Sequence, residues 1–294
     1  MMIERLSETS ARFSGVPFDP RLTLLDSAQV FHWREENGVF AGVSGGHEAR
    51  LIPEANGFLL EGCAPGEEAY WTRYFDLERD YAALRTAVAA CPMALEALER
   101  LPGLRVLRQP PWEALVAFII SANNNVGRIR KIVRALIDGL GEDGAFPTPA
   151  ALAGAREEAL RALGCGYRAL FLIRTAGMVA DGFALDAVAA LNYGEAHARL
   201  LRLPGVGDKV ADCVQLFGMG HGEAFPVDVW IERAVKGWIA PEAKTKRDIR
   251  RAARSLFGEN AGLIQQSLFH CARMGLISLD DPQIHLSYKR GGAT

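Results

Sequence analysis

The sequence has no pair of cysteines at the spacing of a metal site. Its cysteines are scattered and odd in number: Cys63, Cys91, Cys165, Cys213 and Cys271. Zinc sites and iron–sulfur loops use close C-x-x-C spacings, so we predict no metal cluster and no iron–sulfur cofactor. In a reducing compartment such cysteines are most simply small buried apolar residues or single thiols.

Long hydrophobic runs are also missing. No apolar stretch approaches the roughly 20 residues that a membrane-spanning helix needs. The first ten residues, MMIERLSETS, contain two acidic residues and one arginine but no apolar core, so we do not expect a secretory signal. We therefore expect a cytoplasmic protein without a membrane partner.

There is little excess charge of either sign. Lys and Arg number 33 and Asp and Glu number 35, for a formal net charge of −2. This balance argues mildly against nucleic-acid binding, because phosphate partners favour a basic surface. The basic residues are nevertheless concentrated in two segments, 128–134 and 244–254. Either segment is equally well explained as a solvated helix face, so charge alone decides nothing.

What is present divides the chain into two parts. Between about residues 20 and 62, short apolar stretches alternate with Gly, Asn, Pro and Asp, which is typical of strands and turns. These stretches are residues 22–25, 39–43, 51–52 and 58–60. From about Asp80 onward the apolar spacing becomes helical. The predicted fold is α+β and mainly α, with a small N-terminal antiparallel β-sheet domain (residues 1–78) packed on a multi-helix body (residues 79–294).

The segment LPGVGDKVADC, residues 203–213, predicts a helix–hairpin–helix over about residues 193–218. Glycines allow close approach of a ligand to the backbone, and a new helix offers free amides and positive dipole at its start. Gly205, Val206 and Gly207 are therefore the predicted phosphate-binding hairpin, which would hold DNA without reading its sequence. The alternative is a pair of helices joined by a glycine turn with no ligand.

Lys209 is predicted to lie in the first turn of the second helix of this hairpin. A lysine amine is nucleophilic only when neutral, and desolvation or nearby positive charge favours that form. Most helix lysines are simply solvated, which is the alternative for Lys209 taken alone.

Asp228 follows about twenty residues later, in the segment AFPVDVW. Pro226 precedes a helix predicted to begin near Val229, which makes Asp228 a natural N-cap. A carboxylate fixed in this way is also suited to stabilising an oxocarbenium-like sugar. A Lys and an Asp at neighbouring helix starts are rarer together than either alone.

The chain resembles the 8-oxoguanine DNA glycosylases of the helix–hairpin–helix superfamily, which have a Gly/Pro-rich loop followed by Asp. The resemblance covers roughly residues 20–275. Its motifs are SAQVFHW (27–33), FAGV (40–43), LRQP (107–110), SANNNVGRI (121–129), LGCGYRA (163–169), the hairpin through Cys213, PVDV (226–229), and AG (261–262) through LF (268–269).

The resemblance implies a chemistry for Lys209 and Asp228. Lys209 would attack C1′ of the damaged nucleotide and form a Schiff base, giving base removal with some β-elimination (AP lyase) activity. Asp228 would stabilise the developing positive charge and assist proton movement. The target base must be flipped out of the stack, which costs a few kcal/mol that the pocket has to recover.

The resemblance also implies the lesion pocket. Cys213 and Phe269 would sandwich the flipped base, Gln265 would hold its Watson–Crick edge, and Pro226 would line the same pocket. Lys209 and Cys213 are four residues apart on one predicted helix face, as are Gln265 and Phe269. From the residues alone, Cys213 and Phe269 would be interpreted as core positions and Gln265 as a solvated helix position. The family accepts a hydrogen bond from N7–H of the oxidised base with a glycine carbonyl, and the matching residue is Gly42.

On the opposite strand, the resemblance gives roles to a second group. Asn123, Arg128 and Arg168 match residues that hold the orphaned cytosine, and Tyr167 matches the wedge that fills the gap. We therefore predict a preference for cytosine opposite the lesion. From the residues alone, 123–125 would be a turn with side-chain caps, and Arg168 a surface ion pair.

Three positions depart from the family pattern. Where the family often has His after Pro-Val-Asp-Val, this chain has Trp230, and the Asp that would partner that His is Ala272. Phe217 replaces a slimmer apolar residue behind the pocket. These departures bear on DNA affinity and turnover, not on the type of reaction.

The competing interpretations are separable by these residues. Endonuclease III and adenine glycosylase relatives would bring a cysteine-ligated cluster, and alkylpurine glycosylases keep the Asp but lack the Lys. A non-catalytic helix–hairpin–helix protein would not need Lys209 and Asp228 together. We expect a monomer that acts on double-stranded DNA containing oxidised guanine, without a cofactor. A single monovalent or calcium ion on the hairpin carbonyls is left open.

Overall fold

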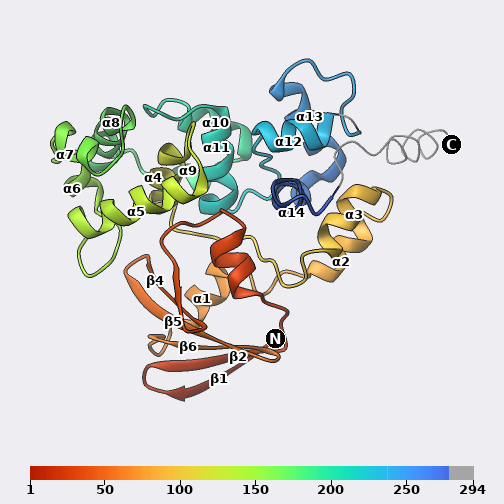
Figure 1. Cartoon of the computed structure of the whole chain (residues 1–294), viewed down its shortest axis with the longest axis horizontal. Helices are drawn as coiled ribbons and strands as arrows, with labels where there is room; N and C mark the ends of the chain where they lie inside the picture. Colours follow the sequence, from red (N-terminus) through yellow and green to blue (C-terminus); the bar gives the residue numbers. More distant parts are fainter. Residues whose placement is uncertain (237, 278–294) are drawn as a thin grey trace.

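The computed structural model describes residues 1–236 and 238–277 and joins an antiparallel sheet to a larger set of helices (Figure 1). Within this part of the chain the sheet has the strand order β1-β2-β6-β5-β4-β3. Its strands are β1 (Met2–Ser7), β2 (Ser10–Ser14), β3 (Arg34–Glu36), β4 (Val39–Ser44), β5 (His47–Glu54) and β6 (Gly57–Glu61). Every neighbouring pair is antiparallel.

The buried face of the sheet packs against the first helix, α1 (Glu68–Tyr74). Phe13 on β2 pairs with Phe58 on β6, and their rings stack with centroids 5.0 Å apart. Trp71 and Tyr74 of α1 are fully buried in the same cluster. Each of these aromatic side chains removes a large apolar area from water, so the cluster stabilises the packing of the sheet on α1.

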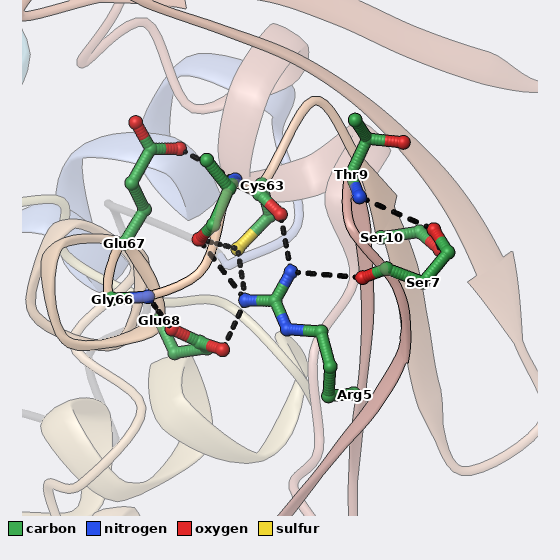
Figure 2. A network of polar contacts seen from close by, with 9 residues as sticks. Arg5, Ser7, Thr9, Ser10, Cys63, Gly66, Glu67 and Glu68 are labelled. Atoms are coloured by element: carbon green, nitrogen blue, oxygen red, sulfur yellow. Dashed lines mark hydrogen bonds and ion pairs between the residues drawn. The ribbon is translucent and has the colours of Figure 1, made fainter.

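A polar network ties the edge strand β1 to the start of α1 (Figure 2). The guanidinium group of Arg5 donates to the carbonyl oxygens of Cys63 and Ala64 and forms an ion pair with Glu68. The residues of β1 are mostly exposed. The network therefore anchors a strand that has few apolar contacts of its own.

The helical body occupies the rest of the described chain (Figure 1). Its helices are α2 (Tyr81–Ala87), α3 (Pro92–Glu99), α4 (Pro111–Ser121), α5 (Val126–Leu140), α6 (Pro149–Ala153), α7 (Glu157–Ala162), α8 (Arg168–Ala180), α9 (Leu185–Ala189), α10 (Tyr193–Leu200), α11 (Asp208–Val214), α12 (Val229–Lys236), α13 (Lys246–Phe257) and α14 (Ala261–Met274). Helix α4 is its central element, because all residues from Glu113 to Ser121 are buried.

Buried side chains join the two parts. Gln29 donates to the carbonyl oxygen of Arg105 and accepts from the amide of Leu107, at 2.8 Å each. Gln109 in turn donates to the carbonyl oxygen of Gln29. On the other side, Glu113 of α4 accepts from the Ser44 hydroxyl and the Gly45 amide at the end of β4. These bonds hold the sheet against the helices at two separate places.

The predicted fold class is confirmed: an N-terminal antiparallel sheet packs on a mainly helical body. One predicted strand is wrong, because residues 22–25 lie in a π-helical segment, Arg21–Asp26. Asp19 accepts a hydrogen bond from the Leu22 amide and Pro20 follows it, which is a helix start and not a strand. Strands β1 and β2 were not among the predicted strands, because the strand-like pattern was recognised only from about residue 20. The boundary at residue 78 stays a prediction.

Candidate active site

A cavity of about 700 Å³ lies where α4, α11, α12 and α14 meet. The predicted site residues that line it are Asn123, Gly205, Gly207, Lys209, Cys213, Pro226, Asp228, Gln265 and Phe269. The first and last of them, Asn123 and Phe269, are 146 positions apart in the sequence. The fold therefore brings together positions that the sequence could group only by family resemblance.

The hairpin that opens this cavity has the predicted form. Helix α10 ends at Leu200, α11 begins at Asp208, and the turn between them contains Gly205 in the left-handed region at φ +80°. A Cβ on Gly205 would lie 2.8 Å from the Cβ of Phe171, so glycine is required there twice over. Gly207 is the N-cap residue and has no side chain, so the first amides of α11 carry no side-chain cap.

Two hairpin carbonyls already accept protein hydrogen bonds. The carbonyl oxygen of Leu203 accepts from the Val206 amide, and that of Pro204 accepts from the Thr175 hydroxyl. Val206 itself is buried and packs beneath the turn. An ion on these carbonyls stays a prediction.

Lys209 lies in the first turn of α11 and its side chain turns inward. Its Nζ donates to Oγ of Ser121 at 3.0 Å and lies 5.3 Å from the ring centroid of Phe118. The amine is therefore partly desolvated against α4 and is not a freely solvated helix lysine.

Asp228 caps α12. One carboxylate oxygen accepts from the amides of Trp230 and Ile231, at 3.0 and 2.9 Å. The helix begins at Val229, as predicted. These bonds fix the direction of the carboxylate at the edge of the cavity.

Gln265 presents an unpaired acceptor at the cavity. Its Nε2 donates to the carbonyl oxygen of Pro226 at 3.0 Å, which fixes the orientation of the amide. Its Oε1 is buried and has no hydrogen-bond partner among the described residues. A buried acceptor left unpaired is costly, so it marks a place where a ligand donor fits.

Cys213 and Phe269 also line the cavity. Burial raises the pKa of the Cys213 thiol to about 12, so the side chain stays a neutral, polarisable surface. Phe269 is only partly buried and packs at the margin of the helical core. Both side chains can therefore contact a flat apolar ligand.

A network of buried charged side chains connects α11 to α10 and α13. Asp212 is fully buried and contacts the Tyr193 hydroxyl at 2.7 Å and Nε of Arg250 at 2.7 Å. His197 of α10 lies between Asp212 and Asp208, at 3.3 and 2.9 Å. The network links α10, α11 and α13, so it fixes the hairpin that carries Lys209.

Two family models together match most of the chain. The HhH-GPD superfamily base excision DNA repair protein model matches residues 116–259, and the 8-oxoguanine DNA glycosylase N-terminal domain model matches residues 12–115. A probable N-glycosylase/DNA lyase from Methanothermobacter thermautotrophicus is 32% identical over 60% of this chain and 65% of its own length. This chain thus spans just under two thirds of that relative.

N-glycosylase/DNA lyase OGG1 of Arabidopsis thaliana is 29% identical over 83% of this chain and 74% of its own length. The crystal structure of the Clostridium acetobutylicum 8-oxoguanine glycosylase/lyase, in complex with double-stranded DNA containing cytosine opposite 8-oxoG, is 32% identical with a TM-score of 0.86. The match covers 94% of this chain and 99% of that one.

The chain belongs to the 8-oxoguanine DNA glycosylases of the HhH-GPD superfamily. Its enzyme class is therefore that of the bifunctional DNA glycosylase/AP lyases of base-excision repair. In the part of the chain that the structure describes, no helix is long and apolar enough to cross a membrane.

The residues predicted to contact the opposite strand include Asn123, which lines the cavity, and Tyr167 and Arg168, which contact the same loop. Asn123 has φ +49°, and its Nδ2 donates to the hydroxyl of Tyr167 at 3.4 Å. Arg168 is buried and donates to the carbonyl oxygens of Ala122 and Asn123, so it is not the surface ion pair of the alternative interpretation. Tyr167 is half-exposed, and its role as a wedge stays a prediction.

Five predicted site residues lie outside the cavity lining: Gly42, Arg128, Tyr167, Arg168 and Val206. Gly42 lies in β4, where a Cβ would come 2.7 Å from the buried ring of Trp33. Close packing against Trp33 therefore accounts for glycine at this position. Arg128 is exposed in the first turn of α5, which Asn125 caps. The roles inferred for Gly42 and Arg128 stay predictions.

Several cavity residues were missed from the sequence. Ser121 and Phe118 contact the Lys209 amine, and Lys246 of α13 lines the same cavity. Ser121 begins the SANNNVGRI motif and Lys246 belongs to the basic segment 244–254. Both residues therefore lie in segments that the sequence analysis singled out, but neither was assigned a role in the site. Trp230 also lines the cavity, next to Asp228. Its partner position, Ala272, is buried on α14.

Proposed function

We propose that this glycosylase removes 8-oxoguanine from double-stranded DNA, with a preference for cytosine opposite the lesion and with Lys209 as the nucleophile. The observation that carries the proposal is the convergence of Lys209, Asp228, Gln265 and Phe269 on one cavity of about 700 Å³. That volume lies within the range of small-ligand pockets and accommodates a flipped nucleotide. The proposed chemistry needs no metal ion or cofactor.

In the proposed reaction the neutral amine of Lys209 gives its electron pair to C1′. The C1′–N9 bond breaks, its electron pair leaves with the base, and the base takes up a proton. Loss of a proton from nitrogen and opening of the sugar ring, with a proton added to the ring oxygen, give a protonated Schiff base. Loss of a proton from C2′ then expels the 3′-phosphate by β-elimination, which is the lyase step.

Asp228 would act electrostatically in this scheme. Positive charge develops on the sugar as the glycosidic bond breaks, and a carboxylate fixed nearby stabilises it without reorganisation. The two amide bonds from Trp230 and Ile231 hold that carboxylate in place.

Base recognition would use the unpaired oxygen of Gln265. The Watson–Crick edge of 8-oxoguanine carries N1–H and an exocyclic amine, and both are donors. Oε1 of Gln265 is a buried acceptor without a partner in the described structure. Cys213 and Phe269 would contact the two faces of the base.

The preference for cytosine would depend on Asn123, Arg128 and Arg168. Cytosine offers acceptors at N3 and O2, which match guanidinium and amide donors. Arg168 would give up at least one of its backbone carbonyl contacts to reach the base. Tyr167 would fill the space left by the flipped nucleotide. We propose that the enzyme acts as a monomer.

The test uses duplexes that carry one 8-oxoguanine opposite each of the four bases, with borohydride in half the samples. We expect a covalent protein–DNA product that forms fastest opposite cytosine and is lost in Lys209→Gln. Excision without trapping would contradict the Schiff base. No excision opposite any base would overturn the substrate assignment and leave a DNA-binding protein.

A further inference from the structure

The Lys209 amine on α11 forms a hydrogen bond with a residue at the end of α4. Nζ of Lys209 lies 3.0 Å from Oγ of Ser121, the last residue of α4. Ser121 is 8% exposed and lines the cavity. The two residues are 88 positions apart in the sequence, so this contact exists only in the folded protein.

The direction of the hydrogen bond is fixed by a second one. The Ser121 hydroxyl donates its single hydrogen to the carbonyl oxygen of Phe118 at 2.8 Å. Toward Lys209 the hydroxyl therefore acts only as an acceptor, and the amine must be the donor. Ser121 cannot remove a proton from the amine, because it has no free base function in this arrangement.

We propose that Ser121 is a positioning residue that sets the orientation of the Lys209 amine for attack on the sugar. The inference rests on the proposed function, since it assigns a role to Ser121 in the Lys209 reaction. A neutral amine has two N–H bonds and one lone pair in three staggered positions. Directing one N–H at Ser121 confines the lone pair to the other two.

The apolar surroundings add to this constraint. The ring of Phe118 lies 5.3 Å from Nζ, and burial keeps the neighbouring Cys213 thiol neutral. Neither group offers a strong competing acceptor. Among the described residues, Nζ of Lys209 donates to Oγ of Ser121 at 3.0 Å, so this hydroxyl is the oxygen acceptor that orients the amine.

The role predicts a specific kinetic signature. Schiff-base formation at an existing abasic site uses the same attack by Lys209 but needs no base recognition. Loss of the Ser121 hydroxyl should therefore slow the reaction on an 8-oxoguanine duplex and on an abasic duplex by a similar factor. DNA binding should not change, because Ser121 is buried at 8% exposure and the hydroxyl is occupied by its bonds to Lys209 and Phe118.

The experiment compares Ser121→Ala, Ser121→Thr and the control Ser267→Ala in the full-length protein. Ser267 is also a buried helix serine that donates to a carbonyl of its own helix, that of Leu263, but it does not line this cavity. Single-turnover borohydride trapping is measured on both duplexes opposite cytosine, with thermal melting as a check on folding. Affinity is measured on a duplex with a tetrahydrofuran abasic analogue.

We expect trapping by Ser121→Ala to fall about 3- to 10-fold on both duplexes, as for the loss of one hydrogen bond, with unchanged affinity. Ser121→Thr should recover most of the rate, and Ser267→Ala should behave as wild type. A Ser121→Ala enzyme that traps at the wild-type rate overturns the role of Ser121 alone. Equal losses in Ala and Thr variants would assign the effect to packing. A wild-type enzyme that traps neither duplex overturns the proposed function itself.

Discussion

Phe217 stacks on Phe118, with ring centroids 5.2 Å apart and planes within 17° of parallel. Phe118 also meets Phe31 edge-on at 5.9 Å, so its ring is held from two sides. The same Phe118 ring lies 5.3 Å from Nζ of Lys209. The size of the Phe217 side chain therefore affects the surroundings of the Lys209 amine indirectly, through the position of the Phe118 ring. This gives a structural account of the departure from the family pattern at Phe217.

Phe217→Leu should test that coupling. The smaller side chain leaves space behind Phe118, which allows its ring to withdraw from Lys209. We expect a stability loss of about 1–2 kcal/mol from the lost packing. We also expect a roughly threefold fall in trapping rate, because the Phe118 ring would no longer confine the Lys209 amine in its position for attack. Thermal melting and single-turnover trapping measure the two effects.

A matched control separates the two effects. Phe257→Leu removes the same atoms from a buried position on α13 that does not line the cavity. It should lose comparable stability at an unchanged trapping rate. If both variants lose rate in proportion to stability, the stack with Phe118 has no special bearing on Lys209.

Gln265→Leu should separate base recognition from nucleophilic attack. The substitution removes the unpaired Oε1 and also frees the carbonyl oxygen of Pro226. Loss of a buried polar contact to the base should slow excision of 8-oxoguanine about 10- to 100-fold. Cleavage of an abasic duplex should change by less than about threefold, because that substrate has no base to hold. Equal losses on both duplexes would place Gln265 outside base recognition.

Local features of the site were predictable from the sequence, but contacts across the fold were not. The cap by Asp228 and the position of Lys209 in the first turn of α11 depend on residues within a few positions of each other. The bond between Lys209 and Ser121 depends on how α4 packs against α11. No periodicity in either segment carries that information, which is why Ser121 had no predicted role.

The sheet shows the same limit. Strands β4, β5 and β6 were recognised because each has a buried face or an apolar run. Edge strand β1 has almost no buried residues, so its pattern is not distinctive. The π-helical segment Arg21–Asp26 is different, because Asp19 and Pro20 before it are a helix-start signal. The run of leucines in the segment was interpreted as a strand instead.

Glu113 gives the protein a pH-dependent link between its two parts. Burial raises its pKa to about 7, although the Gly45 amide and the Ser44 hydroxyl donate to the carboxylate. The folded protein therefore binds a proton more tightly than the unfolded chain. Stability contributed here is complete below about pH 4.5 and is lost as the pH rises to about 7, with a total of about 3 kcal/mol.

Glu113→Gln should remove that dependence. Glutamine can accept from Gly45 and donate to Ser44 without ionising, so it resembles the protonated acid. We expect the variant to match wild type near pH 4.5 and to be the more stable protein at pH 8, by denaturant unfolding. A wild-type minus variant difference that stays flat from pH 4.5 to 8 would mean that the Glu113 carboxylate is well accommodated when charged.

His197 should add a second pH dependence at higher pH. Burial opposes its protonation, but the hydrogen bonds with Asp212 and Asp208 outweigh burial and raise the pKa of His197 above its usual 6.5. Its stabilising contribution is thus present below pH 6.5 and is lost as the pH rises through the higher pKa of the folded state. Because His197 joins α10 to the α11 helix that carries Lys209, loss of its charge should loosen the hairpin.

His197→Gln is the variant that checks this, because the amide keeps a hydrogen bond but cannot carry charge. It should be less stable than wild type at pH 6, and the gap should narrow toward pH 9. Hydrogen exchange of the α11 amides should follow the same trend in wild type, with faster exchange relative to the intrinsic rate at pH 9 than at pH 6. A stability gap independent of pH would show that His197 contributes only its packing, and that Arg250 alone neutralises Asp212 in the folded protein.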